Sequence, residues 1–120
     1  QIPLSERVIP DFILGEFETF MIQVAPSRFQ LSPHDKKNLK EFTFRYFNQL
    51  MNDCTIVVPE IKAVQRARDI YFEHANNKYI SFVDCLLLAT AEHYQYTLFT
   101  KDRRMLFIAE KLGILFYSVA

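Results

Sequence analysis

Three short apolar segments, separated by stretches long enough for helices, constrain the fold of this chain most strongly. They are predicted strands, at residues 54–58, 96–99 and 114–117. The first, from Cys54 to Val58, is apolar and rich in β-branched residues, which is typical of a strand buried on both faces of a parallel sheet. Strands joined by helical segments of ten or more residues form right-handed crossovers. We therefore expect an α/β fold of three layers, with a parallel central sheet flanked by helices.

Capping residues, prolines and a glycine delimit the helical segments. Ser32 and Ser81 are predicted N-caps, Pro26 should end the first helix, and Gly113 should end the last in the left-handed conformation. The expected helices span 10–24, 33–52, 59–76, 82–94 and 103–112, and residues 1–9 are expected to be irregular. Three short strands would cover little of the apolar surface of these helices, which suggests that a strand is missing.

Composition excludes several classes of protein. The chain has 120 residues, half of them apolar, which suits one globular domain. Its 14 acidic and 14 basic residues cancel, so bulk charge would not hold a nucleic acid, although a local basic patch would. It contains no apolar run near the ~20 residues of a membrane span and no sign of an export signal. Cys54 and Cys85 are expected to be buried free thiols in a reducing, cytoplasmic setting.

Glu16 is placed by the helical wheel on the apolar face of the first helix, between Phe12 and Phe20. The buried arc expected from the wheel consists of Phe12, Ile13, Phe17, Phe20 and Met21. A buried carboxylate needs a partner, because an unpaired buried charge costs several kcal/mol or more. The spacing leaves two interpretations open, a salt bridge to an arginine of another helix and a functional ligand.

Asp84 and Asp102 each have a structural and a functional interpretation. Asp84 is the one charge in the first two turns of a helix that should be central and buried, yet it also fits a capping box with Ser81. Asp102 lies just beyond the carboxyl end of the strand at 96–99, where sites form in parallel sheets, although it equally suits a turn or an N-cap. If Glu16 joins them, the three repelling carboxylates favour a hard divalent cation such as Mg²⁺ or Mn²⁺.

Basic side chains surround Asp102 and also line the third helix. Lys101, Arg103 and Arg104 are better placed for phosphate contact than the cations of the third helix, which alternate with acids as on a solvated face. The sequence contains no CxxC, GxGxxG or P-loop, and its histidines lack zinc-ligand spacing, so redox, nucleotide-binding and zinc functions are disfavoured.

Two stretches resemble a known family, the PIN domains. SFVDCLLLATAEHYQYTLFTKDRRM, residues 81–105, resembles the family's carboxyl-terminal signature, in which an acid opens a helix and a later strand ends in T-x-D. IPDFILGEFETF, residues 9–20, is similar to its first acidic helix. PIN domains are metal-dependent ribonucleases, and the small stand-alone ones are often toxins of toxin–antitoxin pairs.

The resemblance implies a site and partners. Glu16, Asp84 and Asp102 would hold Mg²⁺ or Mn²⁺, Thr100 would help to arrange the site, and Lys101 or Arg103 would contact the phosphate of an RNA substrate. The implied activity is hydrolysis of RNA phosphodiester bonds, with an antitoxin protein as a partner.

One departure concerns the family's first strand, which ends in an aspartate and has no counterpart before Glu16. By analogy with the family and with ordinary domain sizes, roughly 15 to 30 residues would precede Gln1. The chain is thus expected to be a single PIN-like domain over residues 1–120 that is incomplete at its N-terminus.

An alternative interpretation is a PIN-like protein-interaction module that binds no metal. The first two helices carry more phenylalanines than one side of a small core readily absorbs, including Phe12, Phe17, Phe20, Phe42, Phe44 and Phe47. Some of them would then form a groove for a partner's helix or the face of a homodimer. In that case the acids are caps and salt-bridge partners.

Overall fold

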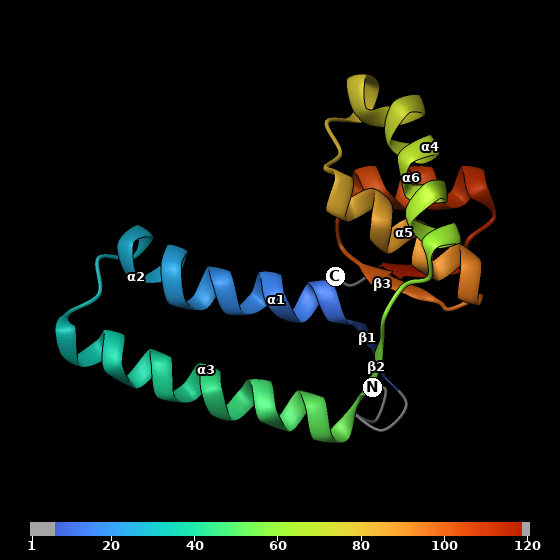
Figure 1. Ribbon diagram of the computed structural model, residues 1–120. Helices are drawn as coiled ribbons and strands as arrows, with labels where there is room; N and C mark the ends of the chain where they lie inside the picture. Colours follow the sequence, from blue (N-terminus) through green and yellow to red (C-terminus); the bar gives the residue numbers. More distant parts are fainter. Residues whose placement is uncertain (1–6, 119–120) are drawn as a thin grey trace. The chain divides into compact units, whose positions relative to one another are not determined.

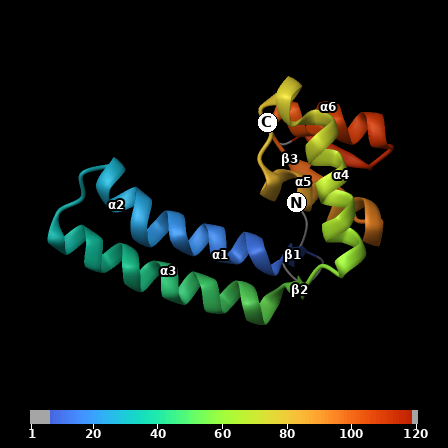
Figure 2. The same cartoon turned by 45° about the horizontal axis from the view of Figure 1, so that its top comes forward.

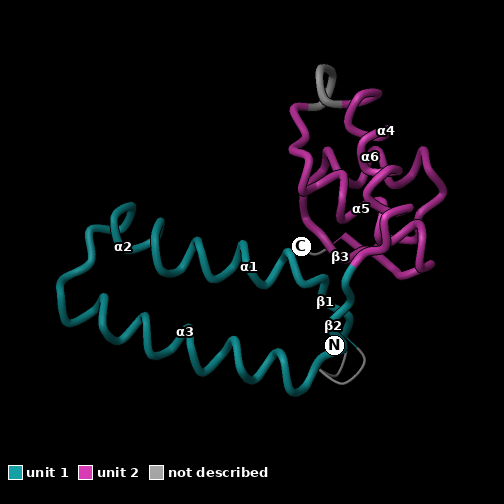
Figure 3. The backbone as a smooth tube through the Cα atoms, in the orientation of Figure 1, with its two compact units in different colours: residues 1–58 teal, residues 59–120 magenta. Residues whose placement is uncertain are grey.

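The computed structural model describes residues 7–118, apart from the side chains of residues 75–78 (Figure 1). The chain forms two compact units, residues 1–58 and 59–120, shown in teal and magenta in Figure 3. The expectation of an irregular start falls mostly on residues 1–6, which lie outside the described residues. The elements of the first unit are β1 (Val8–Pro10), α1 (Asp11–Thr19), the π-helical segment η2 (Phe20–Val24), α2 (Ala25–Arg28), α3 (Pro33–Asp53) and β2 (Thr55–Val57).

β1 is not expected from the sequence, and it begins inside the segment expected to be irregular. It pairs in parallel with β2, with Val8 opposite Thr55 and Pro10 opposite Val57. The expectation that β2 is buried on both faces is wrong, since Thr55 is exposed and Ile56 is half-buried. The reason is that this sheet has two strands among the described residues, so each is an edge strand.

Pro26 does not end the first helix, contrary to the prediction. The backbone switches to π-helical hydrogen bonding at η2, where the Ala25 amide donates to the Phe20 carbonyl, and continues as α2 to Arg28. Proline lacks an amide hydrogen and its ring clashes with the carbonyl four residues earlier in a regular helix. A π-helical turn changes that spacing and lets the chain pass the proline as the first turn of α2.

α3 begins where its capping residue predicts. The Ser32 hydroxyl accepts a hydrogen bond from the Asp35 amide at 3.1 Å, and Pro33 occupies the first helical turn, where no amide hydrogen is needed. Figures 1 and 2 show α3 running alongside α1. Leu14 of α1 and Thr43 of α3 are buried in this unit, and the Thr43 hydroxyl donates to the Leu39 carbonyl at 2.7 Å.

The second unit contains the larger core. Its elements are α4 (Ile61–Lys78), α5 (Phe82–Tyr94), β3 (Leu98–Thr100), α6 (Arg103–Leu112) and β4 (Phe116–Ser118). The bounds of α5 and α6 agree with the sequence prediction. α5 supplies the centre of the core, as its apolar sequence predicts, and packs against α4 and α6. The fully buried side chains of this core include Ala67, Ile70, Cys85, Leu88, Ala89, Ile108 and Ala109.

β3 and β4 form a parallel pair with α6 as the crossover, in the β-α-β order that the sequence predicts. Phe99 lies opposite Tyr117 in this register, and Gly113 ends α6 with a φ of +72°, a conformation that favours glycine. The described residues therefore form small parallel sheets with helices, two strands in each unit, where the sequence predicts one central sheet. None of the helices in this part of the chain combines the length and the apolar character of a membrane-spanning segment.

Candidate functional site

Asp84 lies in the first turn of α5 and takes part in the capping box that the sequence suggests. The Ser81 hydroxyl accepts a hydrogen bond from the Asp84 amide at 3.1 Å, and Asp84 Oδ2 accepts one from the Ser81 amide at 3.4 Å. Among the described residues, Asp84 Oδ1 accepts no hydrogen bond. The side chain is half-buried. The capping interpretation is thus confirmed, and one carboxylate oxygen stays available to a further ligand.

The residue after Asp84 is a buried thiol. Cys85 is fully buried and makes no disulfide, and Cys54 is also a buried free thiol, as expected. Burial raises the pKa of Cys85 to about 11, and the negative charge of Asp84 adds to this effect. The thiol is therefore neutral and packs as part of the apolar core.

Asp102 is the N-cap of α6, directly after β3. Its Oδ1 accepts hydrogen bonds from the Arg104 amide at 2.9 Å and from Arg104 Nε at 3.3 Å, and its Oδ2 accepts one from Arg104 Nη2 at 3.3 Å. Burial of the carboxyl opposes ionisation, but the hydrogen bonds from Arg104 outweigh it, so the pKa of Asp102 lies below its ordinary value. Thr100 Oγ1 accepts a hydrogen bond from the Asp102 amide at 3.1 Å, which fixes the turn between strand and helix.

Arg104 connects the beginnings of the two helices that carry these acids. Besides binding Asp102, its Nη1 donates to the carbonyl oxygen of Tyr79 at 3.3 Å, two residues before the N-cap of α5. The N-termini of α5 and α6 therefore lie within the span of one arginine side chain. The positive dipole end of each helix favours anions and carboxylates at its N-terminus.

The other basic residues of the second unit differ in how they are paired. Lys101 and Arg103 are exposed and form no ion pair among the described residues. Arg66 of α4 instead binds Glu92 of α5, with Nε to Oε1 at 2.7 Å and Nη2 to Oε2 at 3.3 Å. Lys101 and Arg103, which follow β3, are accordingly the cations nearest in sequence to Asp102 that are available to a phosphate.

Glu16 belongs to the first unit and is exposed. The predicted buried arc of α1 is wrong, because Leu14 is the buried residue of that helix and Phe20 is 37% exposed. Glu16 forms no ion pair with any described residue, so the structure does not support a salt bridge to an arginine. Water solvates a carboxylate at such a position, and no partner is needed to offset burial.

The structure places Asp84 and Asp102 in one unit and Glu16 in the other. Within the described part of each unit, no three histidine, cysteine, aspartate or glutamate side chains group closely enough to hold a metal ion. The donor chemistry of Asp84 and Asp102 nevertheless suits a hard divalent cation, because both offer carboxylate oxygens. Asp84 fits this role more simply than Asp102, whose two oxygens are both bound to Arg104.

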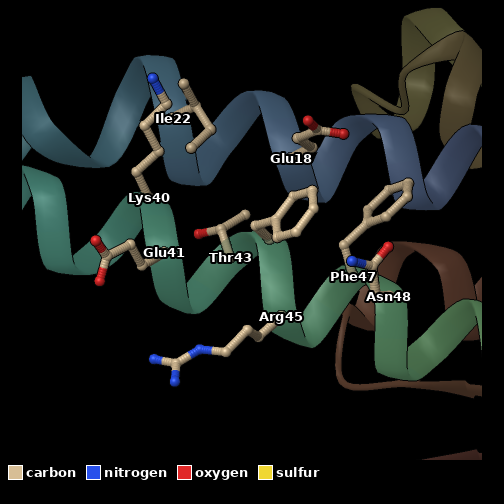
Figure 4. A pocket seen from close by; sticks show the side chains of 9 residues that line it. Glu18, Ile22, Lys40, Glu41, Thr43, Arg45, Phe47 and Asn48 are labelled. Atoms are coloured by element: carbon tan, nitrogen blue, oxygen red, sulfur yellow. The ribbon is translucent and has the colours of Figure 1, made fainter.

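A groove of about 680 Å³ lies between α1–η2 and α3 in the first unit (Figure 4). Figure 4 shows Thr43 and Phe47 directed into the space between the helices, while Arg45 points away from it. The side chains that line the groove are Glu18, Ile22, Lys40, Glu41, Thr43, Phe44, Arg45, Phe47 and Asn48. The sequence pointed to the phenylalanines as groove residues but not to Thr43. Thr43 lies between Phe42 and Phe44, and nothing in that stretch indicates that its hydroxyl is buried.

The family model of the PIN domain matches residues 1–111. Neither the curated proteins nor the solved structures compared with the chain include a significant match.

Proposed function

Because the chain belongs to the PIN domain family, whose members are generally metal-dependent nucleases, we propose that it is a metal-dependent endoribonuclease that hydrolyses RNA phosphodiester bonds. The observation that carries this proposal is the extent of the match, since residues 1–111 include Glu16, Asp84, Thr100 and Asp102. The packing of the N-termini of α5 and α6 around Arg104 supports it, because it brings the regions of Asp84 and Asp102 together.

The proposed ligands of Mg²⁺ or Mn²⁺ are Asp84, Asp102 and Glu16. When bound, such a cation lowers the pKa of a coordinated water and offsets negative charge on a phosphate. Asp84 Oδ1 accepts no hydrogen bond among the described residues, and Asp102 stays ionised because Arg104 holds its pKa low. Asp102 therefore presents negative charge at neutral pH, as the role requires.

The remaining residues of the proposed site act on the substrate and on the turn. Lys101 and Arg103 would bind the phosphate and stabilise the charge that develops on it. Thr100 would act indirectly. Its hydroxyl accepts a hydrogen bond from the Asp102 amide and so fixes the position of Asp102 at the beginning of α6. Removing that hydroxyl should reduce cleavage by displacing Asp102 rather than by removing a catalytic group.

Asp84→Asn tests the proposal. The variant protein should lose Mn²⁺-dependent cleavage of a single-stranded RNA while its thermal unfolding stays close to that of the wild type. Asp69→Asn is the matched control, because Asp69 is an exposed acid of α4 whose nearest cation, Arg68, is 3.9 Å away. We expect the control to cleave at the wild-type rate. Cleavage that is undiminished in Asp84→Asn refutes the proposal.

The groove of the first unit favours a second function, binding of another protein. Its exposed apolar side chains include Phe44, which is 69% exposed, and Ile22. The lining also carries acids, Glu18 and Glu41, together with bases, Lys40 and Arg45. A patch with both signs of charge is able to complement itself across a two-fold axis, so we propose a second copy of the chain as the occupant.

Sedimentation of Phe44→Asp tests this second function. The substitution places a charge in the groove and should shift the protein from dimer toward monomer, whereas Phe72→Asp on α4 should not. A wild-type protein that is monomeric at high concentration refutes the homodimer. In that case an antitoxin protein, which a toxin of a toxin–antitoxin pair requires, becomes the occupant to test, by co-purification of the partner and its loss in Phe44→Asp.

A further inference from the structure

Two exposed aromatic rings form a stacked pair on one face of the β3–β4 sheet. Phe99 and Tyr117 are partners in the strand register, with ring centroids 5.2 Å apart and ring planes inclined by 23°. Phe99 is 46% exposed and Tyr117 is 63% exposed. Leu98, which points to the opposite face of β3, is only 4% exposed and belongs to the core. Leu98 of β3 therefore faces the core, and the opposite face of the sheet displays the ring pair.

The exposed rings are close in sequence to the proposed site. Asp102 lies three positions after Phe99 in the sequence, so their Cα atoms are at most about 11 Å apart. Lys101 follows β3, Arg103 begins α6, and both are exposed without an ion pair among the described residues. Phe99 of the exposed ring pair is thus followed in the sequence, at the carboxyl end of β3, by two cations without an ion pair among the described residues, Lys101 and Arg103.

This combination matches the chemistry of a single-stranded nucleic acid. Aromatic side chains stack on bases, and lysine or arginine beside them binds the phosphates. A second copy of this chain suits the face less well, because a two-fold contact would bring Lys101 and Arg103 of both copies toward each other. β4 carries no acid that would offset this repulsion.

We propose that Phe99 and Tyr117 stack on a base of single-stranded RNA, while Lys101 and Arg103 bind the phosphates that follow it. The inference rests on the proposed nuclease function and deepens it, since the rings would position the strand so that a phosphodiester reaches Asp102. Stacking accepts any base, so the platform would select single strands over duplexes and not a particular sequence.

Binding measurements on ring-free variants test the platform. Fluorescence anisotropy with a 5′-labelled eight-nucleotide single-stranded RNA, in EDTA to prevent cleavage, gives the dissociation constant. Phe99→Leu and Tyr117→Leu keep an apolar side chain and remove the ring, and each should weaken binding about 5- to 100-fold. Phe72→Leu is the matched control, since Phe72 is 74% exposed on α4 of the same unit, and it should bind like the wild type.

The salt dependence supplies an independent measurement. Lys101→Gln should weaken binding and reduce the slope of log affinity against log salt by about one, as loss of one phosphate contact does. The leucine variants should leave that slope unchanged, because they remove stacking and no charge. Equal slopes in Lys101→Gln and the wild type would remove the phosphate part of the proposal.

Each outcome bears on one proposal. Unchanged affinity in both leucine variants, or no RNA binding by the wild type, overturns the stacking platform. If the ring variants bind weakly as expected but the wild type cleaves no RNA with Mn²⁺, the nuclease function fails and the platform stands. If the leucine variants instead change the sedimentation coefficient of the protein, the face is a contact between copies and the platform is wrong.

Discussion

Asp102 and Arg104 are joined by three hydrogen bonds, and the same arginine binds the carbonyl of Tyr79 before α5. The pair performs two tasks. It caps α6 through the Arg104 amide, and it holds the beginning of α6 against the loop that leads into α5. A catalytic role for Asp102 would therefore be added to a structural one, and experiments have to separate the two.

Asp102→Asn and Asp102→Ala should separate them. Asparagine caps a helix about as well as aspartate, so the first variant should lose at most about 1 kcal/mol, mainly from the ion pair with Arg104. Alanine removes the cap as well and should cost about 1 to 3 kcal/mol. Both should lose metal-dependent cleavage if the carboxylate is a ligand. Urea unfolding and RNA cleavage measure the two effects, and an active Asp102→Asn would leave Asp102 with the structural role alone.

Ser81→Ala makes the same distinction at α5. It removes the hydroxyl that accepts from the Asp84 amide and leaves the carboxylate of Asp84 intact. We expect it to destabilise the protein by about 0.5 to 2 kcal/mol and to keep most of the cleavage activity at temperatures well below unfolding. Thermal unfolding and initial cleavage rates check this. Equal losses of activity in Ser81→Ala and Asp84→Asn would mean that Asp84 acts through the cap.

The sequence predicts an element of this fold well when the residues that determine the element lie close to it in the chain. The bounds of α5 and α6 follow from Ser81 and Gly113, because caps act on amides and carbonyls within one turn. The strand at β1 escaped notice since its partner, β2, lies more than forty residues away. The prediction that Pro26 ends the first helix was wrong for a different reason. A π-helical turn depends on backbone geometry that residue type does not specify.

In the candidate site, too, local contacts could be predicted from the sequence and distant ones could not. The capping roles of Asp84 and Asp102 are visible in the sequence, since both depend on residues at most three positions away. The contact from Arg104 to Tyr79 spans 25 positions and has no sequence signal. The helical wheel placed Glu16 on a buried face because it assumes that every apolar residue of the predicted helix 10–24 is covered, whereas Phe20, which begins η2, remains partly exposed.

Leu88→Ala should be the most damaging simple truncation in the second unit. Leu88 is fully buried in the core of this unit, and removing its side chain should cost about 2 to 5 kcal/mol because the cavity collapses only in part. Leu115→Ala is the matched control, since Leu115 is 72% exposed and should change stability by no more than about 0.5 kcal/mol. Urea unfolding of both variants measures the difference, and similar midpoints would contradict the assignment of the core.

Cys85 should make the protein less stable at alkaline pH. Its pKa is about 11 in the folded protein against an ordinary value of 9.0, so the unfolded chain releases the proton first as the pH rises. The stabilisation is complete below pH 9 and is lost between about pH 9 and 11, in the direction that proton linkage requires. Comparing the pH dependence of unfolding in wild type and Cys85→Ala isolates this effect from the tyrosines and lysines.

At pH 8, iodoacetamide should modify Cys85 in urea and spare it in the native protein, because the folded thiol is both buried and neutral. Equal modification rates in the two states would show that this part of the core opens easily.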